Sequence, residues 1–170
     1  LLRRKIKNLV ILRLFNVVGL FKKFKTFRFK KENYQRFIFK IFDLVKVKKE
    51  IQLNYIMDKK TKNFPGRDFI DINDLIDLIT TICKKISTNN NISGIYNVGS
   101  GTITPINSII KLIEKKFNKK IKLKLQKIDK NEINYTCAKI KKIKNKFQWY
   151  PKVSLEKSIT STFKYLITKK

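Results

Sequence analysis

Short apolar runs along the chain predict five strands. Residues 9–15 are almost entirely apolar and partly β-branched, which predicts a buried strand. Apolar and polar positions alternate over residues 51–56, and Ile or Leu alternates with Lys over residues 121–125, so both segments are predicted as amphipathic strands. The runs 69–72 and 95–98 are predicted as short strands.

Five further segments space their apolar residues three or four positions apart, which predicts helices with one buried stripe. These segments are residues 33–45, 74–86, 105–117, 140–147 and 155–167. Thr104 is predicted to cap the third helix, with Pro105 at its first position, and Ser154 to cap the last.

The segments between these elements are predicted as loops. They include Asn16–Gly19, the basic and aromatic residues 20–31, and the polar residues 58–66, which end in the turn signal Pro65-Gly66. Mixed short strands and several helices indicate an α/β or α+β fold. A chain of 170 residues has room for one domain of ordinary size.

The net charge of +29 is high enough to be typical of proteins that bind nucleic acid or anionic membranes. Only six of the 41 basic residues are Arg, however, and the Lys residues are spread over the whole chain. That pattern favours a compositional bias on solvated faces. Residues 21–31 interleave Phe and Lys, either as a single-strand nucleic-acid surface or as Lys stems covering apolar surface.

Cysteine and histidine usage restricts the chemistry further. Cys83 and Cys137 lie far apart and the chain has no His, which excludes a Cys/His zinc site and predicts two buried free thiols. No apolar run approaches the ~18 residues of a membrane span. Residues 1–5 are not followed by the apolar segment of a signal peptide, so a cytoplasmic location is expected.

Four segments, in this order along the chain, are similar to sequence motifs of one protein family. Residues 11–19 are similar to LRxFNxxG, and residues 67–75 to RDFIHVxDL. Residues 96–101 read Tyr-Asn-Val-Gly-Ser-Gly before a proline-led helix, and residues 138–151 are similar to ADxxKAxxxLGWxP. Together they resemble the extended short-chain dehydrogenase/reductases, the NAD-dependent epimerase/dehydratase family.

Within that family the chain looks most like the UDP-glucose/UDP-galactose 4-epimerase branch. The loop from Tyr55 to Arg67 is long, and the Asn-led segment 33–38 falls where that branch has a helix. The resemblance implies that residues 1–170 form one C-terminal substrate-binding region. This region would combine the last strands of a Rossmann-type domain with the small C-terminal domain.

The family's N-terminal half has no counterpart in this sequence. That half holds a Gly-rich loop that binds the NAD pyrophosphate and a Tyr-x-x-x-Lys pair that moves the proton. Here no GxxGxxG occurs, and no Tyr is followed by Lys four residues later in a matching context. We therefore interpret the chain as a fragment, a split gene product or a degraded gene product, inactive alone, whose implied cofactor NAD is bound mainly by the missing half.

The resemblance assigns roles to four residues. Arg67 would clamp the nucleotide diphosphate, because a guanidinium pairs bidentately with phosphate oxygens; its alternative is a surface Arg that bridges a nearby Asp. Asn16 and Asn33 would contact the substrate, although Asn16 could simply satisfy a turn and Asn33 could be a helix N-cap. Phe15 would line the nicotinamide pocket, or belong to the core.

Other motif residues favour structural roles. Trp149 and Pro151 are expected to lock the last helix onto the domain. Gly99 and Gly101 lack the third glycine of a dinucleotide fingerprint and predict a tight turn. The chain also departs from the family pattern at Leu20 for Pro, Asp71 for His, Lys139 for Asp and Gln148 for Gly.

Three functional hypotheses follow. The first is a nucleotide-sugar epimerase or dehydratase remnant that binds a nucleotide sugar, with a separate N-terminal half as a partner and with no catalytic or metal-binding residue of its own. A family Arg of the nucleotide site would fall near Asp129 or Lys130, so Lys130 could replace it. The second hypothesis is a basic nucleic-acid-binding protein, and the third is a structural fragment. For the first we expect no specific nucleic acid and no membrane as a partner.

Overall fold

The computed structural model describes residues 8–20, 37–46, 50–58, 60–88, 92–128 and 134–168. Its elements are β1 (Val10–Leu14), β2 (Asn16–Val18), α1 (Phe37–Lys46), β3 (Ile51–Asp58), β4 (Thr61–Asn63), β5 (Gly66–Asp71), α2 (Ile72–Thr88), β6 (Gly94–Val98), β7 (Ile103–Pro105), α3 (Ile106–Phe117), β8 (Leu123–Lys127), α4 (Lys141–Phe147) and α5 (Leu155–Thr168). The mixed α/β class predicted from the sequence is confirmed.

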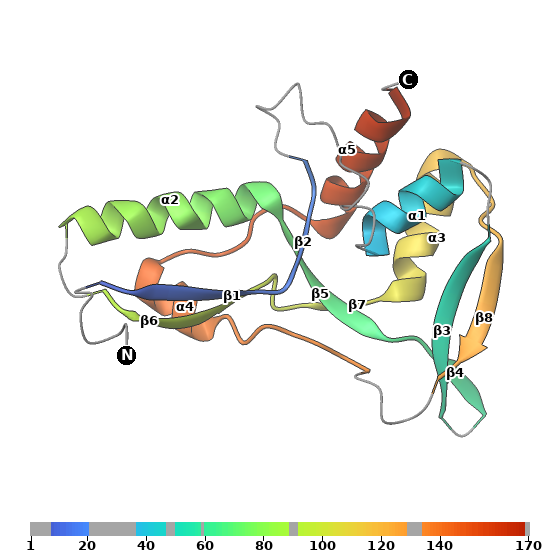
Figure 1. Ribbon diagram of the computed structural model, residues 1–170, viewed down its shortest axis with the longest axis horizontal. Coiled ribbons are helices and arrows are strands. Elements are labelled where there is room, and N and C mark those ends of the chain that lie inside the picture. The colour runs from blue at the N-terminus through green and yellow to red at the C-terminus, as the bar shows by residue number, and fades with distance from the viewer. Residues whose placement is uncertain are drawn as a thin grey trace.

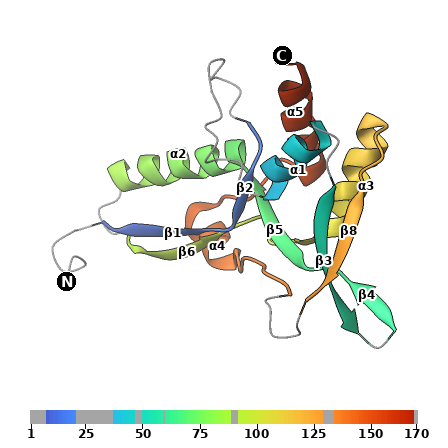
Figure 2. The same cartoon turned by 45° about the vertical axis from the view of Figure 1, so that its right-hand side comes forward.

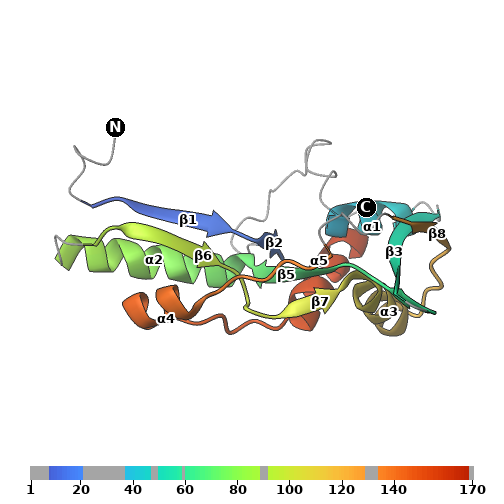
Figure 3. The same cartoon turned by 90° about the horizontal axis from the view of Figure 1, so that it is seen from below.

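The strands form three small sheets arranged along an elongated molecule (Figure 1). β1 and β6 pair in parallel, and α2 and α4 lie beside them (Figures 1 and 3). In the middle sheet, β5 pairs in parallel with β2 and antiparallel with β7. β3 pairs with β4 and β8 at the other end, near α1 and α3 (Figure 2).

Two hydrophobic cores meet at β5. Because side chains alternate along a strand, Phe69 packs into a core with α1, β3, α3 and α5, while Ile70 packs into a second core with α2, β6 and α4. Trp149 belongs to the second core and is 3% exposed. β5 therefore joins the two halves of the molecule.

One prediction for the N-terminal segment was wrong. Asn16–Gly19 was predicted as a loop, but Asn16–Val18 forms β2, because its pairing with β5 overrides the turn preference of Asn. Val10–Leu14 forms the predicted strand, β1, and its apolar residues Ile11 and Leu14 are 37% and 50% exposed. In the described part of the chain β1 has a strand only on its β6 side, which leaves its other edge uncovered.

The start of α3 also differs from its prediction. Thr104 pairs with Arg67 across β5 and β7, and Pro105 is the extended N-cap rather than the first helical residue. The cap has no side-chain hydrogen bond, and the N–H of Ile106 donates to Pro65 O instead. The prediction for Ser154 is confirmed, since its Oγ accepts from Lys157 N at 3.3 Å.

The remaining expectations have mixed outcomes. Both cysteines are free, as predicted, but both are exposed rather than buried. The predicted helix 33–45 corresponds to α1, whose described residues begin at Phe37. The interleaved segment 21–31 lies outside the described residues. No helix among the described residues is both long enough and apolar enough to span a membrane.

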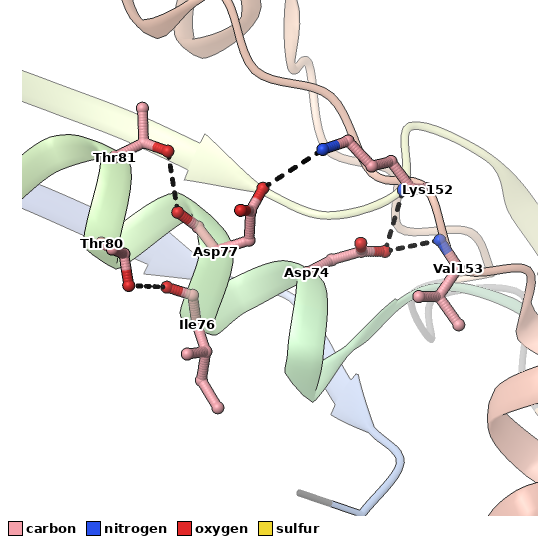
Figure 4. A network of polar contacts seen from close by, with 7 residues as sticks. All are labelled: Asp74, Ile76, Asp77, Thr80, Thr81, Lys152 and Val153. Atoms are coloured by element: carbon pink, nitrogen blue, oxygen red, sulfur yellow. Dashed lines mark hydrogen bonds and ion pairs between the residues drawn. The ribbon is translucent and has the colours of Figure 1, made fainter. Parts of the chain in front are cut away.

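A buried carboxylate fastens the start of α2 to the segment before α5 (Figure 4). Asp74 is 4% exposed, and its Oδ2 accepts hydrogen bonds from Lys152 N at 3.1 Å and Val153 N at 2.9 Å. One turn further along, Asp77 makes only an exposed ion pair with Lys152 Nζ at 3.7 Å.

This contrast predicts different costs for the same substitution on one helix. Asp74→Asn should lower the free energy of unfolding by about 1–3 kcal/mol, because a neutral amide oxygen accepts hydrogen bonds more weakly than a carboxylate and an NH2 group replaces the second buried oxygen. Asp77→Asn should change it by no more than about 0.5 kcal/mol, since an exposed ion pair contributes little. Urea unfolding of both variants measures the difference; equal losses would contradict the account.

Candidate functional site

Three buried aspartates organise the segment from β5 into α2. Asp68, Asp71 and Asp74 are 0%, 4% and 4% exposed, and each accepts hydrogen bonds from backbone N–H groups. A buried carboxylate is costly unless it is paired or hydrogen-bonded. Hydrogen bonds from several parts of the chain thus hold this segment, which carries the candidate site residue Arg67.

Asp68 has the largest set of donors. Its Oδ1 accepts from the N and Oγ of Ser100, both at 2.7 Å. Its Oδ2 accepts from Gly101 N at 3.0 Å and Ala138 N at 2.9 Å. The Sγ of Cys137 lies 3.9 Å from Oδ2, and partial desolvation together with the charge of Asp68 raises the pKa of this thiol. Cys137 is therefore a poor nucleophile at neutral pH.

The glycine pair forms the predicted tight turn. Gly101 has φ +77, and a Cβ on Gly99 would lie 2.5 Å from Asp68 Oδ2, so neither position tolerates a side chain without movement. The amides of Ser100 and Gly101 already donate to Asp68. This turn therefore does not fit the pyrophosphate of NAD, and the other described residues form no glycine-rich cradle at a helix start.

Asp71, which stands where the family motif has His, caps α2. Its Oδ1 accepts from the N and Nδ2 of Asn73, each at 2.7 Å. An Asp directly before an apolar helical pattern is a recognisable N-cap signal. The sequence analysis missed that role because it compared the position with the family pattern only.

The guanidinium of Arg67 is anchored from one side. Its Nη1 donates to Gly66 O at 2.9 Å and to Asn134 O at 3.1 Å. In the described part of the chain no ion pair joins Arg67 to Asp68 or Asp71, which was the alternative considered from the sequence. Among the described residues no hydrogen bond from Nε or Nη2 is seen.

Asn16 lies on the strand next to Arg67. Asn16 pairs with Phe69, two residues after Arg67, and its Nδ2 donates to Asp68 O at 2.9 Å. Directly paired residues of parallel strands, and residues two apart on one strand, share a face of the sheet. The structure therefore brings Asn16 and Arg67 to one face.

The other candidates are placed differently. Phe15 is half-buried against the second core, on the side of β5 that carries Ile70, so it does not share the face of Asn16 and Arg67. Asn33, Asp129 and Lys130 lie outside the described residues. Among the described residues no group of three or more His, Cys, Asp or Glu could hold a metal ion.

Tyr and Lys occur four residues apart at three places, but none of these pairs is seen on one helix face. Tyr135 and Lys139 belong to an extended segment, and Tyr55 belongs to β3 while Lys59 is outside the described residues. Tyr165 lies on α5, and its Lys169 is also outside them. The described residues thus present no Tyr-x-x-x-Lys pair arranged for proton transfer.

The sequence matches the profile of the NAD dependent epimerase/dehydratase family over residues 3–99, more than half of its length. The chain therefore belongs to this family, as its motifs predicted. A search of curated proteins found no match.

Solved structures share the fold at low sequence identity. UDP-glucose 4-epimerase from Stenotrophomonas maltophila, with NAD and formylated UDP-arabinopyranose, matches with a TM-score of 0.80 and 15% identity, over 93% of this chain and 47% of that one. UDP-glucose 4-epimerase from Bifidobacterium longum, with NAD+ and UDP, gives 0.79 and 20%, over 95% and 48%.

A third similar structure is UDP-glucuronic acid 4-epimerase from Bacillus cereus, in complex with UDP-glucuronic acid and NAD. It matches with a TM-score of 0.71 and 23% identity, over 93% of this chain and 45% of that one. The chain spans about half the length of all three proteins. The likeness shows a common fold, and it confirms the Rossmann-type family architecture predicted from the motifs.

Proposed function

We propose that residues 1–170 form the substrate-binding region of an NAD-dependent nucleotide-sugar epimerase or dehydratase, most like the UDP-glucose 4-epimerases. In this proposal Arg67 binds the diphosphate of the substrate. The observation that carries it is the anchored guanidinium, whose Nη1 is held by Gly66 O and Asn134 O.

This geometry suits a phosphate clamp. Two backbone carbonyls fix the orientation of the guanidinium plane, so less side-chain entropy is lost when a ligand binds. The Nε and Nη2 edge has the fork geometry that pairs with two phosphate oxygens. A surface Arg without these anchors would reach the same position only by ordering its whole side chain.

Asn16 supports the same site. Its Nδ2 donates a hydrogen bond to Asp68 O, and this bond fixes the orientation of the amide. The amide oxygen, Oδ1, then points to a different side, where it can accept a hydrogen bond from a sugar hydroxyl. Asn16 is exposed, so a ligand can reach it. The motif resemblance to the family adds two further roles. Asn33 makes a second contact with the substrate, and the exposed part of the Phe15 ring lines the nicotinamide pocket.

NAD needs a second structural part in this proposal. The described glycine turn is occupied by Asp68, so a Gly-rich loop and a Tyr-x-x-x-Lys pair must come from another segment, on the same polypeptide or a separate one. The uncovered edge of β1, with Ile11 and Leu14 exposed, supports docking of such a part, because exposed apolar surface of this kind marks interaction sites.

The role of Arg67 can be tested with a substitution that keeps its positive charge and removes its bidentate hydrogen-bond donors. Arg67→Lys should weaken UDP-glucose binding by about five- to thirtyfold, a cost of about 1–2 kcal/mol, which is below that of deleting a buried charge partner. Salt-sensitive DNA binding should be nearly unchanged, because the net charge is the same. Calorimetric titration at physiological salt measures the UDP-glucose affinity.

A matched control is Arg13→Lys, which makes the same change at an exposed position of β1. Its affinity for UDP-glucose should equal that of the unaltered chain. Equal affinity in the Arg67→Lys variant would show that Arg67 is an ordinary surface residue.

The 170-residue chain by itself should not turn over UDP-galactose in the presence of NAD. A general acid–base group contributes about 10²- to 10⁴-fold to a rate, and the described residues arrange no Tyr–Lys pair for that purpose. A coupled assay for UDP-glucose formation measures turnover. Activity that purifies with the chain and is lost on Arg67→Lys would overturn this part of the proposal.

A further inference from the structure

Exposed lysines precede α4 (Lys141–Phe147) and lie around its solvent-facing side, with Lys144 and Lys146 on opposite flanks. Lys139, Lys141, Lys144 and Lys146 are all exposed, and we call these four residues the α4 lysine surface. The apolar residues of the same helix, Ile143 and Phe147, are each 1% exposed and pack into the second core. The helix thus turns its apolar side chains inward, and its exposed residues are lysines and Asn145.

Two neighbouring lysines are held in place beside this surface. Lys142 Nζ donates to Ile95 O at 3.0 Å and lies 4.9 Å from the centroid of the Tyr96 ring. Lys85 Nζ, from the end of α2, donates to Lys146 O at 3.0 Å and lies 6.0 Å from the Phe147 ring. These contacts hold the ammonium groups of Lys142 and Lys85 close to the α4 lysine surface.

Apart from Asp74 and Asp77 in the first turns of α2, the segments that build this region contain no acidic residue. Residues 78–113 and 133–155 include neither Asp nor Glu. Asp77, just before the first segment, faces Lys152. On α3 the situation differs, because Lys116 pairs with Glu156 at 2.6 Å and Glu114 lies among the lysines. The positive charge at α4 is therefore less compensated than that at α3.

We propose that the α4 lysine surface binds the phosphate backbone of double-stranded nucleic acid without sequence preference. α4 is about 10 Å long at 1.5 Å per residue, and one strand of a duplex presents about three phosphates over that length. Phosphate contacts from lysines supply affinity and carry no sequence information. A membrane fits less well, because the helix has no outward apolar side chain to insert into lipid.

This surface is separate from the proposed nucleotide-sugar site. α4 packs with α2 and β6 in the second core, whereas Arg67 shares the face of β5 that carries Phe69 and the first core. The two bindings can be tested independently, since neither depends on a residue of the other.

The test compares two variants of the full chain with equal net charge. One replaces Lys139, Lys141, Lys144 and Lys146 by Gln; the control replaces the exposed lysines Lys111, Lys115, Lys119 and Lys120 by Gln. Fluorescence anisotropy with two duplexes of unrelated sequence gives the dissociation constant between about 50 and 200 mM salt. The slope of log affinity against log salt counts the phosphate contacts.

The α4 variant should reduce the magnitude of this slope by about 2–3, since each lost phosphate contact removes about 0.9, and by the same amount for both duplexes. The control should reduce it by less than about 1. Equal reductions in the two variants would show that only the general positive field acts and would overturn the proposal. Tighter binding to vesicles rich in anionic lipid than to either duplex would overturn the choice of partner.

Discussion

The fully buried carboxylate of Asp68 is the constraint on which the centre of the molecule depends. A charge at 0% exposure needs several donors, and it finds them on Ser100, Gly101 and Ala138, which lie 32, 33 and 70 residues away in the sequence. These bonds join β5 to the turn after β6 and to the segment before α4. Losing any of these donors would leave part of a buried charge without a hydrogen-bond partner, which is costly.

The same residue also connects the structure to its proposed function. The carbonyl of Asp68 accepts from Asn16 Nδ2, and its neighbour Arg67 is fixed by Gly66 O and Asn134 O. The polar groups that hold β5 in place therefore orient both substrate-binding candidates as well. Burial of Asp68, Asp71 and Asp74 has a second effect, because three of the twelve acidic residues no longer face the solvent among the lysines.

Local pattern was enough to predict α2, β3 and the Ser154 cap, because apolar periodicity and capping chemistry act over a few residues. The family motifs located the segment that contains Arg67 for the same reason. Pairing partners decided what the sequence analysis missed: Asn16 became part of a strand through β5, and Thr104 through its register with Arg67. The donors to Asp68 and the anchor of Arg67 at Asn134 could not be predicted, since they come from distant parts of the chain.

Amide hydrogen exchange at Ser100, Gly101 and Ala138 tests most directly whether the Asp68 carboxylate holds these segments together. All three amides lie outside helices and strands, yet the account predicts that they exchange far more slowly than an unstructured peptide. In Asp68→Asn, which replaces one acceptor oxygen by an NH2 group, protection should fall on both the turn and Ala138, while the amides within α3 stay protected. Rapid exchange at Ser100 and Gly101 in the unaltered chain would contradict the account.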